Sequence, residues 1–350
     1  MSTSQAGGGR LRAYIEFLGA VVYFFFARAL ARSGAQGLAN DQFEPLVEQT
    51  MLLFLLLLGY AAMGFWLDRQ QHPVAAQGLP RRRGWPGEAG LGLALGWGLA
   101  LACVLFMVVG GGIAIVLVLG PSAWGWLVVD AVFFALVALA EEVAFRGYGF
   151  QQFERAVGPL GAALGFAAYY AIVQTLLPGS TQIVPGSTHA SVAVSIGLSL
   201  ALSIAYLRTR ALWVSWGINF GWKASRALLF GLAISGVSNR SPVVQGNPMG
   251  PFWLTGGGYG LDGSWGAFLL LLAALPVVYR LTRELDYRYN APVIVPGGIP
   301  VDLDAAARQQ HEAAMGQTEP AAPGLVQILP AVAPPAALPP DNSHADPTKD

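Results

Sequence analysis

The chain has 350 residues, of which 54% are hydrophobic and only 11% are charged. Soluble domains carry roughly 25% charged residues, so this composition excludes an ordinary soluble domain and indicates an integral membrane protein. The 20 basic and 20 acidic residues give a formal net charge of zero, which excludes the basic balance typical of nucleic-acid-binding proteins. We therefore expect a multi-pass chain in the cell membrane, with the lipid bilayer as a partner and no nucleic acid.

Apolar segments long enough to cross a bilayer recur along the chain, because a spanning helix needs about 20 mostly apolar residues. We predict about eight of them, near residues 13–31, 46–67, 89–119, 124–152, 159–177, 189–207, 211–236 and 264–284. Gly110, Gly111 and Gly112 interrupt the third segment, which we expect to be a spanning helix followed by a broken or re-entrant piece. The predicted fold is an all-α polytopic membrane helix bundle.

The arginines predict an orientation, because cytoplasmic loops collect Lys and Arg. With the N-terminus inside, Arg28, Arg32 and Arg240 fall on the outer side and the arginines of the other loops fall on the cytoplasmic side. An even number of spans returns the C-terminus to the cytoplasm. The first apolar run also resembles a signal peptide, since basic residues precede it and small residues follow it, but Glu16 inside the run favours a packed first helix.

The chain is expected to have three parts, of which composition marks off the last. Residues 1–79 are predicted to form an N-terminal two-helix membrane segment, and residues 80–288 the main membrane domain. Residues 289–350 are rich in Pro and Ala with scattered charges. Such a composition cannot bury a core, so we expect a disordered cytoplasmic tail.

Three charges end the fourth apolar segment, in the stretch LAEEVAFRGYGFQQF at 139–153. A charge at mid-bilayer costs about 2.5 to 3.5 kcal/mol on insertion scales, so it must be paired or functional. Glu142 and Arg146 are four residues apart on one helix face, in the favourable order for an ion pair. Glu141 points about 100° away and is left over, which makes it a candidate general base.

This pattern, EExxxR followed by FQQF, resembles the first signature of the CPBP family, which includes the CAAX prenyl proteases and whose members are intramembrane glutamic endopeptidases. The resemblance extends over roughly residues 80–285. It includes the arginine-rich stretch RRRGWPGEAGLG, the segment LRTRALWVSWGINFGWK and the loop PVVQGNPMGPFWLTGGGYGLDGSWGA. Several matches in the same order are more specific than EExxxR alone. The resemblance implies a peptide hydrolase in which a glutamate and a histidine activate water.

The resemblance also implies roles for single residues. Glu141 matches the catalytic glutamate, with Glu142 and Arg146 as its neighbours in the signature. The second family motif, FxxxH, matches Phe166 and Tyr170, so a tyrosine stands where the family has its histidine. A tyrosine hydroxyl can hydrogen-bond a water but is a poor partner for activating it near neutral pH. Loss of such a group typically lowers the rate by a factor of about 10² to 10⁴.

The third family motif, HxxxN, supplies groups that stabilise the oxyanion, and it matches Asn219 and Lys223. Both active-site histidines are therefore replaced. Asn219 could still donate to an oxyanion through its amide. Lys223 could do the same, or it could form a salt bridge with Glu141 and make that carboxylate a structural ion. We expect the salt bridge.

Polar residues recur at helical spacing on three of the predicted segments. Residues 166, 170 and 174 share one stripe, and residues 219, 223 and 226 share another. Polar groups in a membrane protein usually face the interior of the bundle. With Glu141, both stripes are therefore expected to line one polar cavity. Serines at 191, 195, 199 and 203 form a third stripe, which favours close helix packing.

Other chemistry has weaker support. His189 is expected on the side of the membrane opposite Glu141, too far away to replace a missing histidine. Two adjacent glutamates without a partnered histidine make a weak metal site, so we expect no metal and no cofactor. The loop GGGYG at 256–260 lacks the context of a phosphate-binding loop and suits an interfacial loop anchored by aromatic residues. A transporter is a further alternative, without any visible pair of inverted halves.

Two functions from different classes follow. The preferred one is a pseudoprotease of the CPBP family, whose degenerate site binds a membrane-associated peptide or protein without cutting it. The alternative is an active intramembrane glutamic endopeptidase that uses Glu141 with a non-histidine partner. The mechanism favours the first, because both histidine positions have changed, and family descent alone favours the second.

Overall fold

The computed structural model describes residues 3–117, 120, 123–175, 188–235 and 243–289. All of these belong to one unit of the chain, residues 1–291. The tail predicted at 289–350 lies outside the described residues except for Tyr289, and so does Arg240. The division of the membrane part at residue 79 and the disorder of the tail stay predictions.

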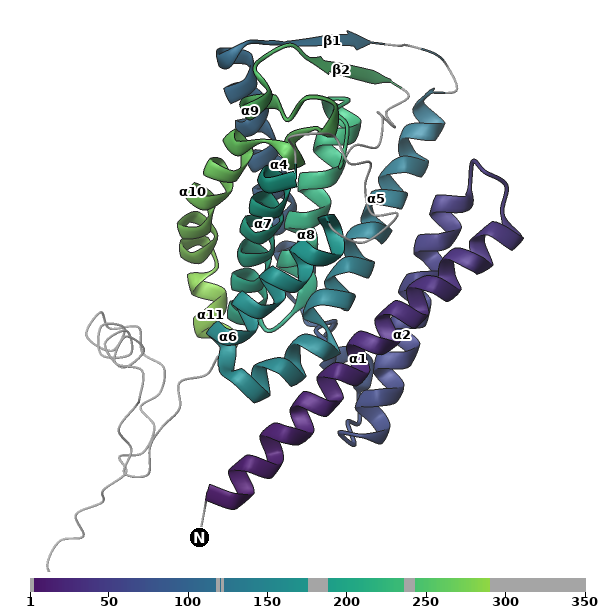
Figure 1. Cartoon of the computed structure of the whole chain (residues 1–350), viewed down its shortest axis with the longest axis vertical. Helices are drawn as coiled ribbons and strands as arrows, with labels where there is room; N and C mark the ends of the chain where they lie inside the picture. Colours follow the sequence, from purple (N-terminus) through teal and green to yellow (C-terminus); the bar gives the residue numbers. More distant parts are fainter. Residues whose placement is uncertain (1–2, 118–119, 121–122, 176–187, 236–242, 290–350) are drawn as a thin grey trace, which may run out of the picture. The chain divides into compact units, whose positions relative to one another are not determined.

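Helices make up most of the described chain (Figure 1). Their bounds are α1 Thr3–Leu38, α2 Glu44–Trp66, α3 Pro73–Ala76, α4 Trp85–Gly110, α5 Ala123–Arg146, α6 Tyr148–Thr175, α7 Thr188–Thr209, α8 Leu212–Ala224, α9 Phe252–Thr255, α10 Trp265–Leu281 and α11 Arg283–Tyr289. A π-helical turn, Ser225–Leu229, continues α8, and two 3-10 turns cover Gly257–Tyr259 and Leu261–Gly263. The prediction of an all-α helical membrane bundle is confirmed.

Five segments of the described residues are long and apolar enough to cross a membrane. They are Gly9–Leu38, Glu44–Trp66, Trp85–Gly110, Ala123–Thr175 and Thr188–Thr209, the fourth of which contains both α5 and α6. The helices α8 and α10 have 13 and 17 residues, fewer than the roughly 20 that a spanning helix needs. The chain is therefore a multi-pass membrane protein in a lipid bilayer, but the predicted count of eight spans is not confirmed.

The third predicted segment ends differently from the prediction. The helix α4 stops at Gly110 as expected, but the piece after the glycines is a strand, β1 (Ile113–Leu117), and not a re-entrant helix. It pairs antiparallel with β2 (Val244–Pro248), so that Ile113 lies opposite Pro248 (Figure 1). The run IAIVL is rich in β-branched residues, which favour strands. Its partner lies far along the sequence, which is why the apolar run alone could not identify it.

The fourth and fifth predicted segments are also divided differently. The helix α5 ends at Arg146, earlier than predicted, and α6 starts at Tyr148. Within α6, Gly158 has a φ of 84° directly before Pro159, which kinks the helix. Glu141 thus lies near the end of α5, and the part of α6 after the kink carries Tyr170.

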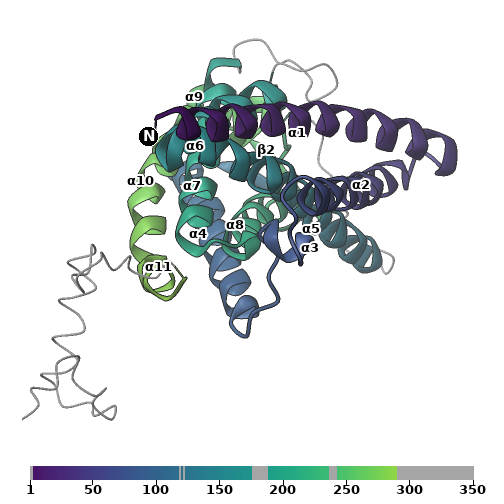
Figure 2. The ribbon, with the colours of Figure 1, turned by 90° about the horizontal axis from the view of Figure 1, so that it is seen from below.

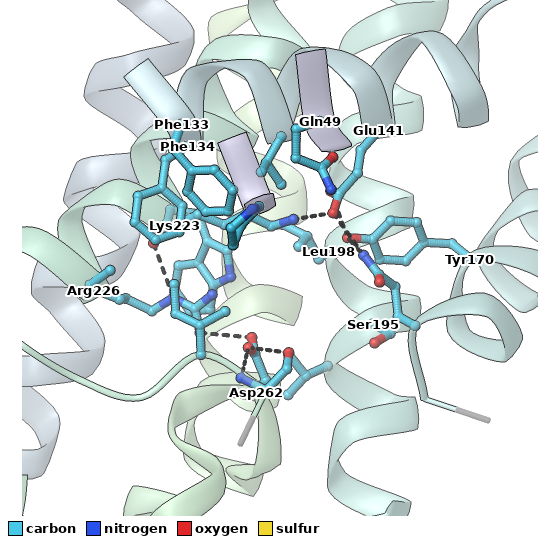
Figure 3. A pocket seen from close by; sticks show the side chains of 18 of the residues that line it. Gln49, Phe133, Phe134, Glu141, Tyr170, Ser195, Leu198, Lys223, Arg226 and Asp262 are labelled. Atoms are coloured by element: carbon cyan, nitrogen blue, oxygen red, sulfur yellow. Dashed lines mark hydrogen bonds and ion pairs between the residues drawn. The ribbon is translucent and has the colours of Figure 1, made fainter. Parts of the chain in front are cut away.

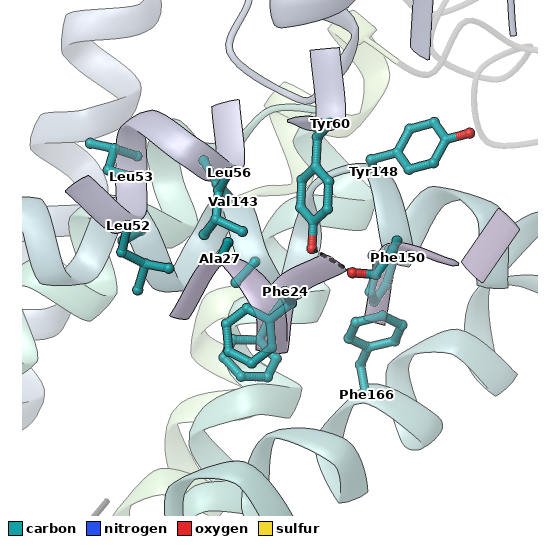
Figure 4. Packing of buried hydrophobic residues seen from close by; sticks show 14 of the residues in the cluster. Phe24, Ala27, Leu52, Leu53, Leu56, Tyr60, Val143, Tyr148, Phe150 and Phe166 are labelled. Atoms are coloured by element: carbon teal, nitrogen blue, oxygen red, sulfur yellow. Dashed lines mark hydrogen bonds between the residues drawn. The ribbon is translucent and has the colours of Figure 1, made fainter. Parts of the chain in front are cut away.

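The N-terminal helices pack onto the rest of the bundle. The helix α1 contacts α2 and α6, and α2 also contacts α5. Their shared core contains Phe24 of α1, Leu56 of α2 and Val143 of α5 (Figure 4). The Tyr60 hydroxyl donates to the backbone oxygen of Ala20 at 3.3 Å. This packing agrees with the expectation of a packed first helix.

Glycines bring α4 and α8 into close contact, and the two helices lie side by side in Figure 2. A Cβ atom on Gly92 or Gly96 of α4 would collide with backbone atoms of α8. A Cβ on Gly217 or Gly221 of α8 would collide with the backbone of α4. Small residues allow such an approach between membrane helices. The contact fixes α8, and α8 carries two of the predicted site residues.

Candidate functional site

Helices from both halves of the described chain enclose a cavity of about 360 Å³ (Figure 3). Part of its polar lining comes from α5, α6, α7, the end of α8 with the turn that follows, and the Leu261–Gly263 turn. This part includes Glu141, Tyr170, Gln174, Ser195, Lys223, Arg226 and Asp262. Phe133, Phe134 and Leu198 form part of the apolar lining. Tyr170 and Gln174 of one predicted stripe and Lys223 and Arg226 of the other line this cavity, whereas Asn219 is not part of its lining.

Four side chains donate hydrogen bonds to the carboxylate of Glu141. Oε1 accepts from Gln174 Nε2 at 3.0 Å and from Lys223 Nζ. Oε2 accepts from Asn219 Nδ2 at 2.9 Å and from the Tyr170 hydroxyl at 3.3 Å. The predicted ion pair between Glu141 and Lys223 is present (Figure 3). A carboxylate offers about four lone-pair sites, so these protein donors saturate it.

Two of these donors, Asn219 and Gln174, use both of their amide N–H groups in hydrogen bonds within the site. Asn219 Nδ2 donates to Glu141 and also, at 3.1 Å, to Oε1 of Glu142. Gln174 Nε2 donates to Glu141 and to the Tyr170 hydroxyl, both at 3.0 Å. A side-chain amide carries two N–H donors. In this arrangement Asn219 therefore has no N–H to offer an oxyanion.

The predicted pair between Glu142 and Arg146 forms a second polar cluster. Arg146 Nη1 lies 3.4 Å from Glu142 Oε1, and neither side chain has exposed surface. Arg146 Nη2 also donates to the backbone oxygen of Ser199 at 3.1 Å and to its hydroxyl at 2.7 Å. Ser199, expected only to favour helix packing, thus helps to hold a buried guanidinium.

Phe166, predicted to share the cavity lining, packs elsewhere. Its ring lies 5.0 Å from that of Phe150 and 5.6 Å from that of Tyr169, in an aromatic cluster. Each four-residue step on a helix turns about 40° past a full circle, so Phe166 and Gln174 point about 80° apart. Phe166 therefore does not face the cavity that Tyr170 and Gln174 line.

A further ion pair lies in the same cavity. Arg226 Nη1 donates to Asp262 Oδ1 at 2.7 Å, Arg226 Nε donates to the backbone oxygen of Trp222, and the guanidinium stacks on the Trp222 ring. Asp262 Oδ2 accepts from the backbone N–H and the hydroxyl of Ser235 at 3.1 and 2.9 Å. Asp262 is not among the residues predicted from the sequence. The signal was that a membrane arginine needs a partner and that Asp262 is the one acidic residue of the loop at 242–267.

The helices α1 and α2 contribute a wall of the cavity that was not predicted from the sequence. Arg28, Glu48 and Gln49 line the cavity, although they lie in the segment predicted to be separate. Arg28 and Glu48 interrupt apolar runs, which was the available signal. His189 is exposed at the start of α7 and does not line the cavity. Among the described residues no group of three or more His, Cys, Asp or Glu is placed to hold a metal ion.

The family comparison agrees with this geometry. A model of the type II CAAX prenyl endopeptidase Rce1-like family matches residues 121–225, a range that holds every predicted site residue. The match confirms the predicted resemblance over this range, and the long apolar helices are those of an integral membrane protein. A comparison with curated proteins found no match, and neither did one with solved structures. The roles of Glu141, Tyr170, Asn219 and Lys223 within the family motifs stay predictions.

Proposed function

We propose that this protein is a pseudoprotease of the cell membrane, which binds a membrane-associated peptide or protein in its cavity without cleaving it. One observation carries the proposal: four protein donors, one of them the Lys223 ammonium, saturate the Glu141 carboxylate. A general base must hydrogen-bond the water that it deprotonates. Water could approach Glu141 as a substrate only by displacing one of these donors.

The other candidate groups are engaged with Glu141 and not with a reacting water. The Tyr170 hydroxyl donates a hydrogen bond to Glu141, and the Asn219 amide donates one to Glu141 and one to Glu142. Lys223 pairs with Glu141 and so favours the ionised, structural form of the carboxylate. The residues at the family's catalytic positions thus hold one another in place.

The cavity itself supports binding. Sites for small ligands are clefts of roughly 300 to 1,000 Å³, and this cavity has such a size, with apolar side chains beside an unusually large share of polar and charged ones. Its lining includes α2, which the family model does not cover. The family resemblance supplies the expectation that the occupant is a peptide near the membrane, which is an argument from descent.

One observation favours the alternative, an active glutamic endopeptidase. The Tyr170 hydroxyl has the longest of the distances to Glu141, 3.3 Å, and borders the open cavity. This weakest contact is the place where a water would replace a protein donor.

A cleavage assay on a peptide library, with purified protein in lipid, separates the two functions. We expect no cleavage by the unmodified chain. The triple variant Tyr170→His, Asn219→His, Lys223→Asn places the family's motif residues back and removes the ion pair, so cleavage by this variant alone would support a disabled site. Cleavage by the unmodified chain that is lost in Glu141→Gln would overturn the proposal.

A further inference from the structure

Hydrogen-bond donors outnumber free acceptors at one side of the cavity. Lys223 carries three N–H donors and Arg226 carries five. Within the part of the chain that the structure describes, Lys223 donates to Glu141 alone, and Arg226 donates only from Nε and Nη1. The Arg226 side chain is 1% exposed, so its remaining donors cannot turn to bulk water. Several N–H groups of Lys223 and Arg226 therefore have no acceptor among the described residues, and they lie beside the cavity.

The carboxylates near these cations have little capacity left. Glu141 accepts four hydrogen bonds, and Asp262 accepts three. Arg28 and Glu48, on the wall formed by α1 and α2, have opposite charges and form no ion pair with the described residues. Their opposite charges leave this wall without a net charge, whereas Lys223 and Arg226 lie beside carboxylates that already have their donors.

The position of the two cations suits one anionic group. Lys223 lies in the last turn of α8, and Arg226 follows three residues later, in the π-helical turn. Side chains with that spacing share a helix face. Single-turn π-helical pieces occur frequently at functional sites. Charge-assisted hydrogen bonds to a carboxylate are roughly twice as strong as neutral ones, and the planar guanidinium matches the two oxygens of a carboxylate.

We infer that the cavity binds a carboxylate attached to an apolar body, with the carboxylate against Lys223 and Arg226 and the apolar part against Phe133, Phe134 and Leu198. The inference rests on the proposed function, since it treats the cavity as a binding site, and it names the chemistry of the occupant. Fatty acids and the C-terminus of an apolar peptide share this chemistry. A ligand with a positive charge would meet Glu141 and Asp262, which already have their donors, and among the described carboxylates of the lining only Glu48 without one.

Native mass spectrometry of the full chain in lipid nanodiscs tests this inference. The probes are decanoate, its methyl ester and acetate, together with an apolar tripeptide as free acid and as amide. We expect one decanoate or one tripeptide acid per chain, bound at least about tenfold more tightly than the ester or the amide, because the neutral groups lose the charge-assisted bonds. Acetate should bind weakly, since it has no apolar body. Whichever acid binds identifies the source of the carboxylate.

Variants locate the binding in the cavity. Arg226→Gln should weaken binding of the acid about tenfold or more, whereas Arg280→Gln, an exposed arginine on α10, should leave it unchanged. Since Arg226 also holds Asp262, a second variant avoids that pair: Ser195→Leu fills the cavity from α7 and should abolish binding. Equal affinity for acid and ester, or a folded Ser195→Leu protein that binds as before, would overturn the inference.

The cleavage assay on the same preparation keeps the two proposals distinct. If the acid binds and the library is cut, the carboxylate site stands and the pseudoprotease proposal fails. If nothing is cut and the acids bind no better than their neutral analogues, the carboxylate inference fails alone.

Discussion

At the scale of single residues, Arg146 carries a charge into the interior of the bundle without any exposed surface. Its partners are the carboxylate of Glu142 and two oxygens of Ser199. Taking two charges out of the solvent is costly, so the pair adds little net stability, but removal of one partner leaves an uncompensated buried charge. Removal of one partner should therefore lower the stability of the protein by more than the intact pair raises it.

Replacement of that guanidinium should be strongly destabilising. We expect Arg146→Met to lower the free energy of unfolding by about 3 to 5 kcal/mol, because Glu142 stays buried without its cation. Arg280→Met, at an exposed position on α10, should change it by about 0.5 kcal/mol or less. Equilibrium unfolding in mixed micelles measures both. Equal effects of the two substitutions would show that the buried pair has no special role.

At the scale of elements, the crossing of α4 and α8 places Asn219 and Lys223 opposite Glu141. The helices approach so closely that glycines on each meet backbone on the other. The family resemblance singled out Glu141, Tyr170, Asn219 and Lys223, and helical spacing grouped Tyr170 with Gln174 and Asn219 with Lys223. The ion pair followed from the need of an intramembrane lysine for a carboxylate.

Other parts of the fold and site depended on contacts that local patterns do not encode. The pairing of β1 with β2 joins segments that are far apart in the chain. A short apolar run by itself is compatible with a helix and with a strand. The lining from α1 and α2 depends on how these helices pack onto α5 and α6. The saturation of Glu141 required the side-chain geometry, because the spacing of Gln174 and Asn219 does not say how each amide divides its two N–H donors.

The glycine contact can be tested within one helix. A Cβ on Gly96 would collide with α8, whereas a Cβ on Gly98 would meet no atom within 4 Å. Both Gly→Ala changes gain about 1 kcal/mol of helix propensity. We expect Gly98→Ala to be as stable as the unmodified chain or slightly more stable, and Gly96→Ala to be less stable by about 1 to 3 kcal/mol through overpacking. Melting temperatures in nanodiscs would contradict this account if Gly96→Ala were as stable as Gly98→Ala.

At the scale of the whole molecule, the topology in the membrane follows from helix length and arginine placement. The helix α4 has 26 residues, a length of about 39 Å, which exceeds the roughly 30 Å of a bilayer core. The loop before α4 is rich in arginine, and β1 and β2 lie beyond its other end. The positive-inside rule therefore predicts the arginine-rich loop in the cytoplasm and the strands outside.

Cysteine labelling tests this orientation. Cys103 is the one cysteine of the chain and is buried, so a Cys103→Ala background reports single introduced cysteines. His72 lies exposed in the loop before α4, and Gln245 lies exposed on β2. An impermeant thiol reagent should label Gln245→Cys in intact cells and His72→Cys only after permeabilisation. The reverse pattern would invert the predicted topology.

We propose that Glu141 is a structural ion held by four protein donors and not a base facing water. An experimental structure in lipid, at a resolution that shows ordered waters, tests it most directly. The account predicts that Lys223, Gln174, Asn219 and Tyr170 occupy the Glu141 carboxylate and that no water lies within hydrogen-bond distance of it. A water bound to Glu141 in place of Tyr170 or Lys223 would contradict the account and support an active endopeptidase.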